Sequence, residues 1–156
     1  MTRTMKRSIL AVGAALLLSS GLFAQDQDDI KQSIEAKRFV FTAQSASPMG
    51  GGTRQLTSGW DLTMAGDSLI SYLPYFGRAF GPVNPGQGGL NFTSTGFEYS
   101  STPGRKGGWD IIIRPTDNRD VRQFNLSVSE SGYGTLQVLS NNRQPISFYG
   151  SLSPTK

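Results

Sequence analysis

The chain has 156 residues, with 15 Lys and Arg, 11 Asp and Glu, no cysteine and no histidine. Without cysteine there can be no disulfide bond and no thiol catalysis, and without histidine there can be no Ser-His-Asp triad. Zinc or copper sites built on these two residue types are excluded as well, and no phosphate-binding glycine string occurs, so we expect no metal and no cofactor.

The first 24 residues have the order of parts of a secretory signal peptide. Lys6 and Arg7 give a short positive start, and an almost wholly apolar run follows from residue 9 to residue 23. Small residues then lead to an expected cut after Ala24, so we expect a periplasmic or secreted mature chain. The apolar run is shorter than the ~20 residues of a spanning helix, although an uncleaved membrane anchor is the alternative. No cysteine is present for lipid attachment, so we expect no stable membrane anchor in the mature form.

Residues 25–156 number 132, which fits a single domain. Three of the 15 basic residues lie in the signal peptide and none of the 11 acidic residues does, so the mature chain would carry a net charge of +1. A nearly neutral domain lacks the basic surface of a nucleic-acid binder, and we expect no nucleic-acid partner.

The mature chain opens with its one good helix candidate, Asp28 to Lys37. Asp26 or Asp28 can cap the start by accepting hydrogen bonds from free backbone N–H groups. Ile30 and Ile34 form a weak apolar stripe at helical spacing. The period of the pattern then changes from helical to alternating.

Alternating apolar and polar residues predict strands at residues 39–43, 60–64, 68–72, 90–92, 97–99, 108–114 and, in the last third, around 124–128, 136–138 and 146–148. Gly66-Asp67 predicts a hairpin turn, and Ser94-Thr95-Gly96 predicts a second hairpin between the fourth and fifth strands. The fold class is therefore mainly β: an antiparallel meander of about eight strands in a strongly curled sheet or barrel, with one N-terminal helix. A two-sheet β-sandwich is the alternative.

Four stretches resemble the domain-of-unknown-function 4251 family. They are FVFTA at 39–43, GDSLISYLPYFGRA at 66–79, GGWDI at 107–111 and GTLQVLSNNRQPISFYG at 134–150. The resemblance spans about residues 28–154. That family comprises exported proteins of Bacteroidota-type bacteria without an assigned activity, so the resemblance implies an exported domain and transfers no catalytic residue.

The aromatic segment from Tyr72 to Arg78 is the candidate ligand-binding site. Its rings cluster around Leu73-Pro74, Pro74 restrains the backbone, and the Gly/Pro-rich residues 77–89 can fold over them as a flap. Aromatic rings and an arginine on a scaffolded loop suit stacking and anion pairing. The alternative is a strand end whose aromatic residues close one end of the core. The candidate residues are Tyr72, Tyr75, Phe76 and Arg78.

Carboxylates are the remaining side chains that could carry catalysis. A glycosidase, for example, needs two acidic groups that face each other across the sugar. By residue type the candidates are Asp61, Asp67, Glu98 and Asp110, but no spacing pairs them. A calcium site at 117–120 would have hard oxygen ligands, but Arg119 in its middle favours an ordinary turn. We assign no catalytic residue and no metal ligand.

These observations favour an exported, non-catalytic ligand- or protein-binding module of the cell envelope. Its partner is a small molecule, a glycan or an envelope protein. The alternative function is an accessory hydrolase that acts on glycans with carboxylates alone. A structural partner domain without a small-molecule site is a third possibility.

Overall fold

The computed structural model describes residues 20–81 and 88–155, so residues 1–19 of the predicted signal peptide and 82–87 of the predicted flap lie outside the described residues. The described part consists of one helix and ten strands, and the ten strands form one antiparallel sheet. The elements are α1 (Ser20–Glu35), β1 (Arg38–Pro48), β2 (Arg54–Gln55), β3 (Asp61–Ala65), β4 (Ser68–Leu73), β5 (Leu90–Ser94), β6 (Phe97–Pro103), β7 (Trp109–Pro115), β8 (Val121–Val128), β9 (Tyr133–Ser140) and β10 (Ile146–Pro154).

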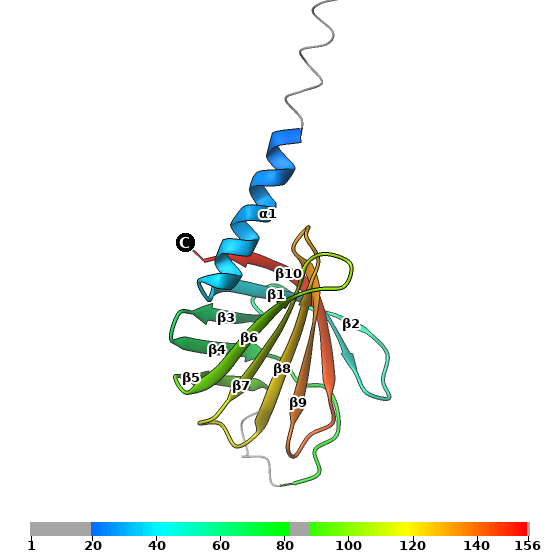
Figure 1. Ribbon diagram of the computed structural model, residues 1–156. Coiled ribbons are helices and arrows are strands. Elements are labelled where there is room, and N and C mark those ends of the chain that lie inside the picture. Colours follow the sequence, from blue (N-terminus) through cyan, green and yellow to red (C-terminus); the bar gives the residue numbers. More distant parts are fainter. Residues whose placement is uncertain (1–19, 82–87, 156) are drawn as a thin grey trace, which may run out of the picture.

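The sheet curls until it is nearly closed as a barrel (Figure 1). Its strand order is β5-β4-β3-β1-β10-β9-β8-β7-β6, and the short β2 pairs with β1 beside this path. β1 and β10 come from opposite ends of the chain and pair from Phe39 opposite Pro154 to Pro48 opposite Ile146. The predicted mainly β, strongly curled antiparallel sheet with one N-terminal helix is confirmed, and the single sheet replaces the sandwich alternative.

The predicted hairpin around Ser94-Thr95-Gly96 is wrong. β5 pairs with β4 and β6 pairs with β7, so the two strands lie at the two ends of the strand order. The chain turns a corner between them, and Asp117 from the β7–β8 loop fixes that corner. Its carboxylate accepts the Ser94 hydroxyl and the backbone N–H groups of Thr95 and Gly96, the latter two at 3.1 and 3.2 Å. The turn was predicted, but the strands on its two sides pair elsewhere, and the residue that holds the turn is more than 20 residues away.

The bounds of α1 also differ from the prediction. In the described residues the helix runs from Ser20 and continues through Asp26 and Asp28, so neither of these residues caps its start. It ends at Glu35 because Lys37 takes a φ of 55°, in the left-handed region that stops a helix. No helix in the described part of the chain is long and apolar enough to cross a lipid bilayer.

The predicted apolar stripe of α1 is what holds the helix to the barrel. Ile30 and Ile34 are buried, and the end of the helix lies against β1 and β10 (Figure 1). Tyr99 of β6 donates its hydroxyl to the Ile34 carbonyl at 2.8 Å, and the Lys37 ammonium lies 5.3 Å from the centre of the Tyr99 ring. The last turns of α1 therefore cover one end of the barrel.

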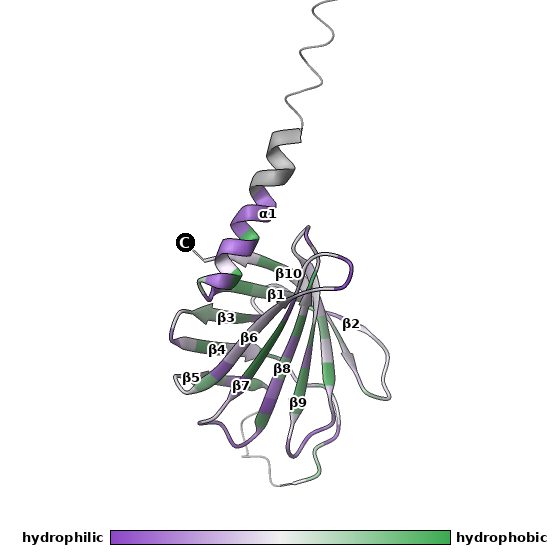
Figure 2. Ribbon diagram, in the orientation of Figure 1, coloured by the Kyte–Doolittle hydropathy of each residue, from purple (hydrophilic) through white to green (hydrophobic). Residues whose placement is uncertain are grey.

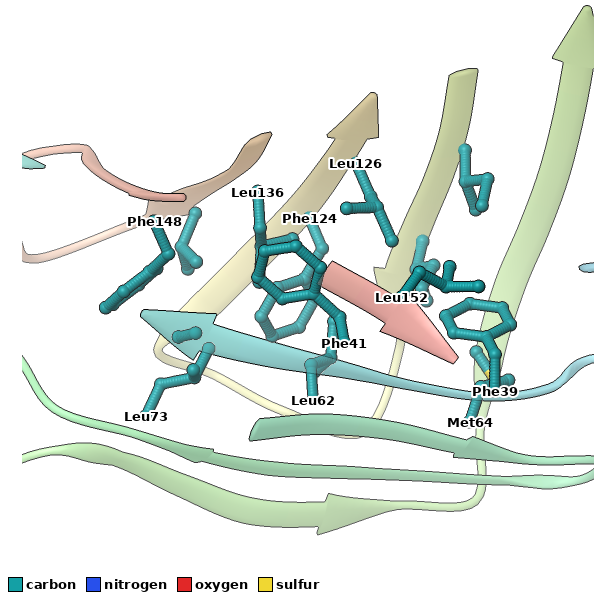
Figure 3. Close-up of a cluster of buried hydrophobic side chains, with 14 of the residues drawn as sticks. Phe39, Phe41, Leu62, Met64, Leu73, Phe124, Leu126, Leu136, Phe148 and Leu152 are labelled. Carbon is teal, nitrogen blue, oxygen red and sulfur yellow. The ribbon is translucent and has the colours of Figure 1, made fainter. Parts of the chain in front are cut away.

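Side chains fill the interior of the barrel. Apolar and polar residues alternate along the strands, and hydrophilic and hydrophobic bands follow one another along β8 in Figure 2. Rings and aliphatic chains from both sides of the curled sheet point toward a common centre in Figure 3. The largest side chains that are fully buried include Phe39, Phe41, Phe124 and Phe148. A core of this kind stabilises a domain of this size without disulfides.

Two glycines allow the central strands to come close where the sheet curls. Gly134 of β9 lies opposite Gly150 of β10, and both are buried. A Cβ atom on Gly150 would overlap the carbonyl oxygen of Thr42, and one on Gly134 would overlap that of Ser127. Glycine at these positions removes the side chain that would otherwise hold neighbouring backbones apart.

Candidate functional site

The predicted aromatic segment, Tyr72 to Arg78, begins on β4 and continues into residues 74–81, which are fixed to the turn between β9 and β10. The Gln144 N–H donates to the Arg78 carbonyl at 3.0 Å, and the Phe80 N–H donates to the Asn142 carbonyl at 2.7 Å. Ala79 and Arg143 form an isolated antiparallel bridge between these two bonds. The segment thus has a defined backbone, although it lies outside the named strands.

Tyr75 supports this segment from within. Its hydroxyl is 3.0 Å from the carbonyl of Arg78 and 3.0 Å from that of Gln144, so one O–H group serves both acceptors. The Arg143 guanidinium lies 4.9 Å from the centre of the ring. Burial raises the pKa of the Tyr75 hydroxyl, and the nearby Arg143 charge opposes that rise in part. One face of the ring is therefore occupied by the protein's own cation.

Arg143 is the residue that sequence reasoning missed. It is only 5% exposed, its Nε lies 3.1 Å from a carboxylate oxygen of Asp120, and its Nη1 donates to the Gly89 carbonyl at 3.4 Å. A buried charge is tolerated when it is paired and hydrogen-bonded. Arg143 follows a turn and precedes a strand in the sequence, where no local pattern distinguishes it from a solvated arginine.

Phe76 has a comparable arrangement with another arginine. The guanidinium of Arg54, in β2, lies 4.9 Å from the centre of the Phe76 ring, and Phe76 is partly buried against the core. Leu56, just after β2, also packs on the core, and its N–H donates to the Gln44 carbonyl at 2.9 Å. β2 had no sequence signal because it is two residues long and both are exposed.

Tyr72 is separated from the other candidates by its position on β4. It occupies a water-facing position between the buried residues Ser71 and Leu73, and its ring stacks on Trp60 with 5.0 Å between centroids and 14° between planes. Arg78, by contrast, shares the segment with Tyr75 and has an exposed side chain. The structure thus brings Tyr75, Phe76 and Arg78 into one segment and gives Tyr72 a partner of its own.

The candidate acids are dispersed, and each has a local partner. Thr63 donates to Asp61 at 3.3 Å, and Ser68 donates to Asp67 at 3.2 Å. The side chain of Glu98 lies 3.9 Å from that of Arg114.

The fourth candidate acid, Asp110, accepts the hydroxyl of Ser127. In residues 117–120, Asp117 holds the β5–β6 corner, Asp120 pairs with Arg143, and the Asn118 side chain accepts two backbone N–H groups at 2.8 Å. Within the described ranges no three His, Cys, Asp or Glu side chains gather as a metal site would require.

Comparison with known proteins gives a family and a fold. The family model of the domain of unknown function DUF4251 matches residues 23–152. The crystal structure of a DUF4251 family protein from Bacteroides eggerthii DSM 20697 is similar, with a TM-score of 0.61 and 21% sequence identity over 85% of this chain and 91% of that chain. No curated protein matches the chain.

Proposed function

This chain belongs to the DUF4251 family, and on that premise we propose that it is an exported, non-catalytic binding module of the cell envelope. The proposal rests on one observation. The segment 74–81 has a backbone fixed to the β9–β10 turn, yet it directs Arg78 and Phe80 into water, with Phe80 71% exposed. A rigid segment that exposes a guanidinium and a ring loses little entropy when it binds a ligand.

The chemistry of these two side chains indicates what such a ligand offers. A guanidinium binds carboxylate or phosphate groups through a planar fork of donors, and a phenyl ring packs on apolar surface. Tyr75 and Phe76 support the segment and do not contact the ligand, since the guanidinium groups of Arg143 and Arg54 already lie over their rings. The ligand class is therefore an envelope component with an anionic group beside an apolar one.

The packing of α1 is compatible with the proposed export. Ile30 and Ile34, which attach the helix to the barrel, both follow the predicted cut after Ala24, and residues 26–29 are exposed. Cleavage would therefore leave the packed part of the helix in place. We expect a mature amino terminus at Gln25, measured by mass spectrometry of the protein from the periplasmic fraction. Soluble periplasmic protein that still begins at Met1 or Met5 would contradict this.

Binding is tested by sedimentation with the envelope fraction of the bacterium that encodes the chain. We expect Arg78→Ala and Phe80→Ser each to lower the bound fraction severalfold, while the melting temperature changes by about 2 °C or less, as is usual for exposed residues. The matched control is Arg105→Ala, an exposed arginine in the β6–β7 turn, which should bind like the wild type. The proposal fails if the wild type stays in the supernatant, if Arg78→Ala and the control bind alike, or if Arg78→Ala unfolds the domain.

A further inference from the structure

A second surface, on the side of the barrel, is built from uncharged side chains. We call it the tyrosine face and define it by six water-facing residues of β9 and β10: Tyr133, Thr135, Gln137, Ser147, Tyr149 and Ser151. The side chains between them, such as Leu136 and Phe148, are buried, so the alternation of the two strands sets the outward direction of the six.

The neighbouring strands extend this uncharged character. Thr42 of β1 lies opposite Ser151, and Ser127 of β8 lies opposite Thr135. At these positions the charged side chains begin one strand further on, with Asp61 of β3 opposite Thr42 and Asp110 of β7 opposite Ser127. Elsewhere on β1 and β8, Arg38 and Arg122 are exposed. A protein surface normally mixes charges of both signs, so a group of paired uncharged positions on β1, β10, β9 and β8 suits an uncharged partner.

The two tyrosines are the large exposed groups of this face, with Tyr133 59% and Tyr149 61% exposed. Tyr133 lies opposite Ser151 and Tyr149 lies opposite Thr135. The two tyrosines are therefore diagonal neighbours on adjacent strands, with about 7–8 Å between their Cα atoms. Within residues 20–81 and 88–155, neither ring stacks on another ring or lies under a cation, whereas Tyr72, Tyr75 and Tyr99 each do one or the other. More than half of each of these two tyrosines therefore remains accessible to solvent.

An ordered row of amide groups adjoins the tyrosines. Gln123 donates to Asn125 within β8, and Asn125 donates to Gln137 of β9 at 3.3 Å. Arg114 of β7 donates to Gln123 at 2.8 Å and so orients the start of the row. Amides held in this way present donors and acceptors in fixed positions, which lowers the entropy lost when a ligand binds.

We propose that the tyrosine face binds a neutral glycan. The C–H face of a sugar ring packs on an aromatic ring, and sugar hydroxyls exchange hydrogen bonds with hydroxyl and amide groups, which is the combination that Tyr, Thr, Ser and Gln supply here. Nucleic acid or an acidic polymer would require cations, which this face lacks. A protein partner of ordinary size would require a broad apolar centre, and the two rings are the large apolar groups of the face. This site is separate from Arg78 and goes beyond the proposed function.

The test is affinity electrophoresis through gels that contain laminarin, mannan or xylan as neutral polysaccharides, with polygalacturonate as the anionic comparison. We expect at least one neutral polysaccharide to retard the wild type, and polygalacturonate to leave it unretarded. Tyr133→Ala and Tyr149→Ala should each weaken the retarding interaction about 5- to 10-fold. Tyr133→Phe and Tyr149→Phe, which keep the ring, should retain most of it. Arg78→Ala should behave like the wild type.

Four results would overturn the inference. In the first, no neutral polysaccharide retards the wild type, and in the second, the double variant Tyr133→Ala/Tyr149→Ala is retarded as strongly as the wild type. In the third, polygalacturonate alone retards the wild type, and in the fourth, Arg78→Ala loses as much retardation as the tyrosine variants. Light scattering after size exclusion gives a further check, because a dimer that dissociates in the tyrosine variants would assign the face to a second copy. Envelope sedimentation that depends on Arg78 together with absent polysaccharide binding would remove this inference and leave the proposed function standing.

Discussion

Arg143 and Asp120 form an ion pair, 3.1 Å from Nε to Oδ2, in which the arginine side chain is almost fully buried and the carboxylate is partly exposed. The pair joins the β9–β10 turn to the β7–β8 loop, and the same guanidinium lies over the ring of Tyr75. A charged side chain is thus part of the structure that supports the segment carrying Arg78.

Removing the negative charge of Asp120 should destabilise the domain. In Asp120→Asn the buried guanidinium loses its counter-charge, so we expect the free energy of unfolding to fall by about 1–3 kcal/mol. Urea unfolding at neutral pH measures the change. The control is Asp67→Asn, an exposed turn residue whose partner is Ser68, where the change should stay within about 0.5 kcal/mol. Equal effects in the two variants would show that the ion pair contributes no stability.

Gly150 should tolerate no side chain. The Cβ of Gly150→Ala would overlap the carbonyl oxygen of Thr42 on β1, so the central ladder must open or shift. We expect a loss of about 3 kcal/mol or more, since overpacking against backbone leaves little room to relax. Thermal unfolding measures it, with Gly52→Ala as the control because nothing lies within 4 Å of that position. A Gly150→Ala domain as stable as the control would show that the two strands can separate freely.

Tyr99 should make the fold sensitive to alkali. Burial raises the pKa of its hydroxyl to about 12, and a hydrogen bond with Ser101 opposes the rise. Since the folded pKa exceeds the unfolded value of 10.0, this contribution to stability is complete below pH 10 and is lost as the pH rises toward 12. Absorbance titration should show one tyrosine ionising last, and Tyr99→Phe should remove that step. Tyr99→Phe that loses stability above pH 10 as steeply as the wild type would contradict the assignment.

Asp117 should give the fold a corresponding sensitivity to acid. The Ser94 hydroxyl lowers the pKa of the Asp117 carboxyl, and the N–H groups of Thr95 and Gly96 add to this. Because the folded pKa lies below the unfolded value, the stability contribution is present above about pH 4 and is lost as the pH falls through the folded pKa.

The matching variant is Asp117→Asn, which keeps an acceptor oxygen but has no proton to gain in this range. We expect the drop in melting temperature between about pH 6 and pH 3 to be smaller in this variant than in the wild type. A drop of the same size in both would mean that the β5–β6 corner does not depend on the charge of residue 117.

The alternating pattern predicted most strands because a half-buried strand repeats every two residues, as at Phe124, Leu126 and Val128. Strand pairing was a different matter. The Ser94–Gly96 turn has ordinary hairpin chemistry, but Asp117 fixes it as a corner, and that contact has no trace in the local sequence. The pairing of β1 with β10 likewise joins residues at opposite ends of the chain.

The candidate site likewise combines features that the local sequence shows with contacts that it does not show. Clustered rings and Arg78 identified the segment from its composition, but its role depends on Gln144, which is 69 residues from Tyr75. The tyrosine face was missed because Tyr133 and Tyr149 lie just outside the strands predicted around 136–138 and 146–148, whereas β9 and β10 include them. Only the register between β9 and β10 brings these two rings together.

The pairing of the first strand with the last also brings the end of β10 beside the start of β1, with the Thr155 N–H donating to the Arg38 carbonyl at 3.2 Å. A linker that also runs the length of α1 would connect Thr155 to the start of the helix, and new ends opened among the exposed residues 50–53 would give a circular permutant with every strand pair preserved. In that permutant a fluorescent reporter would be attached at the loop between β1 and β2 instead of at α1.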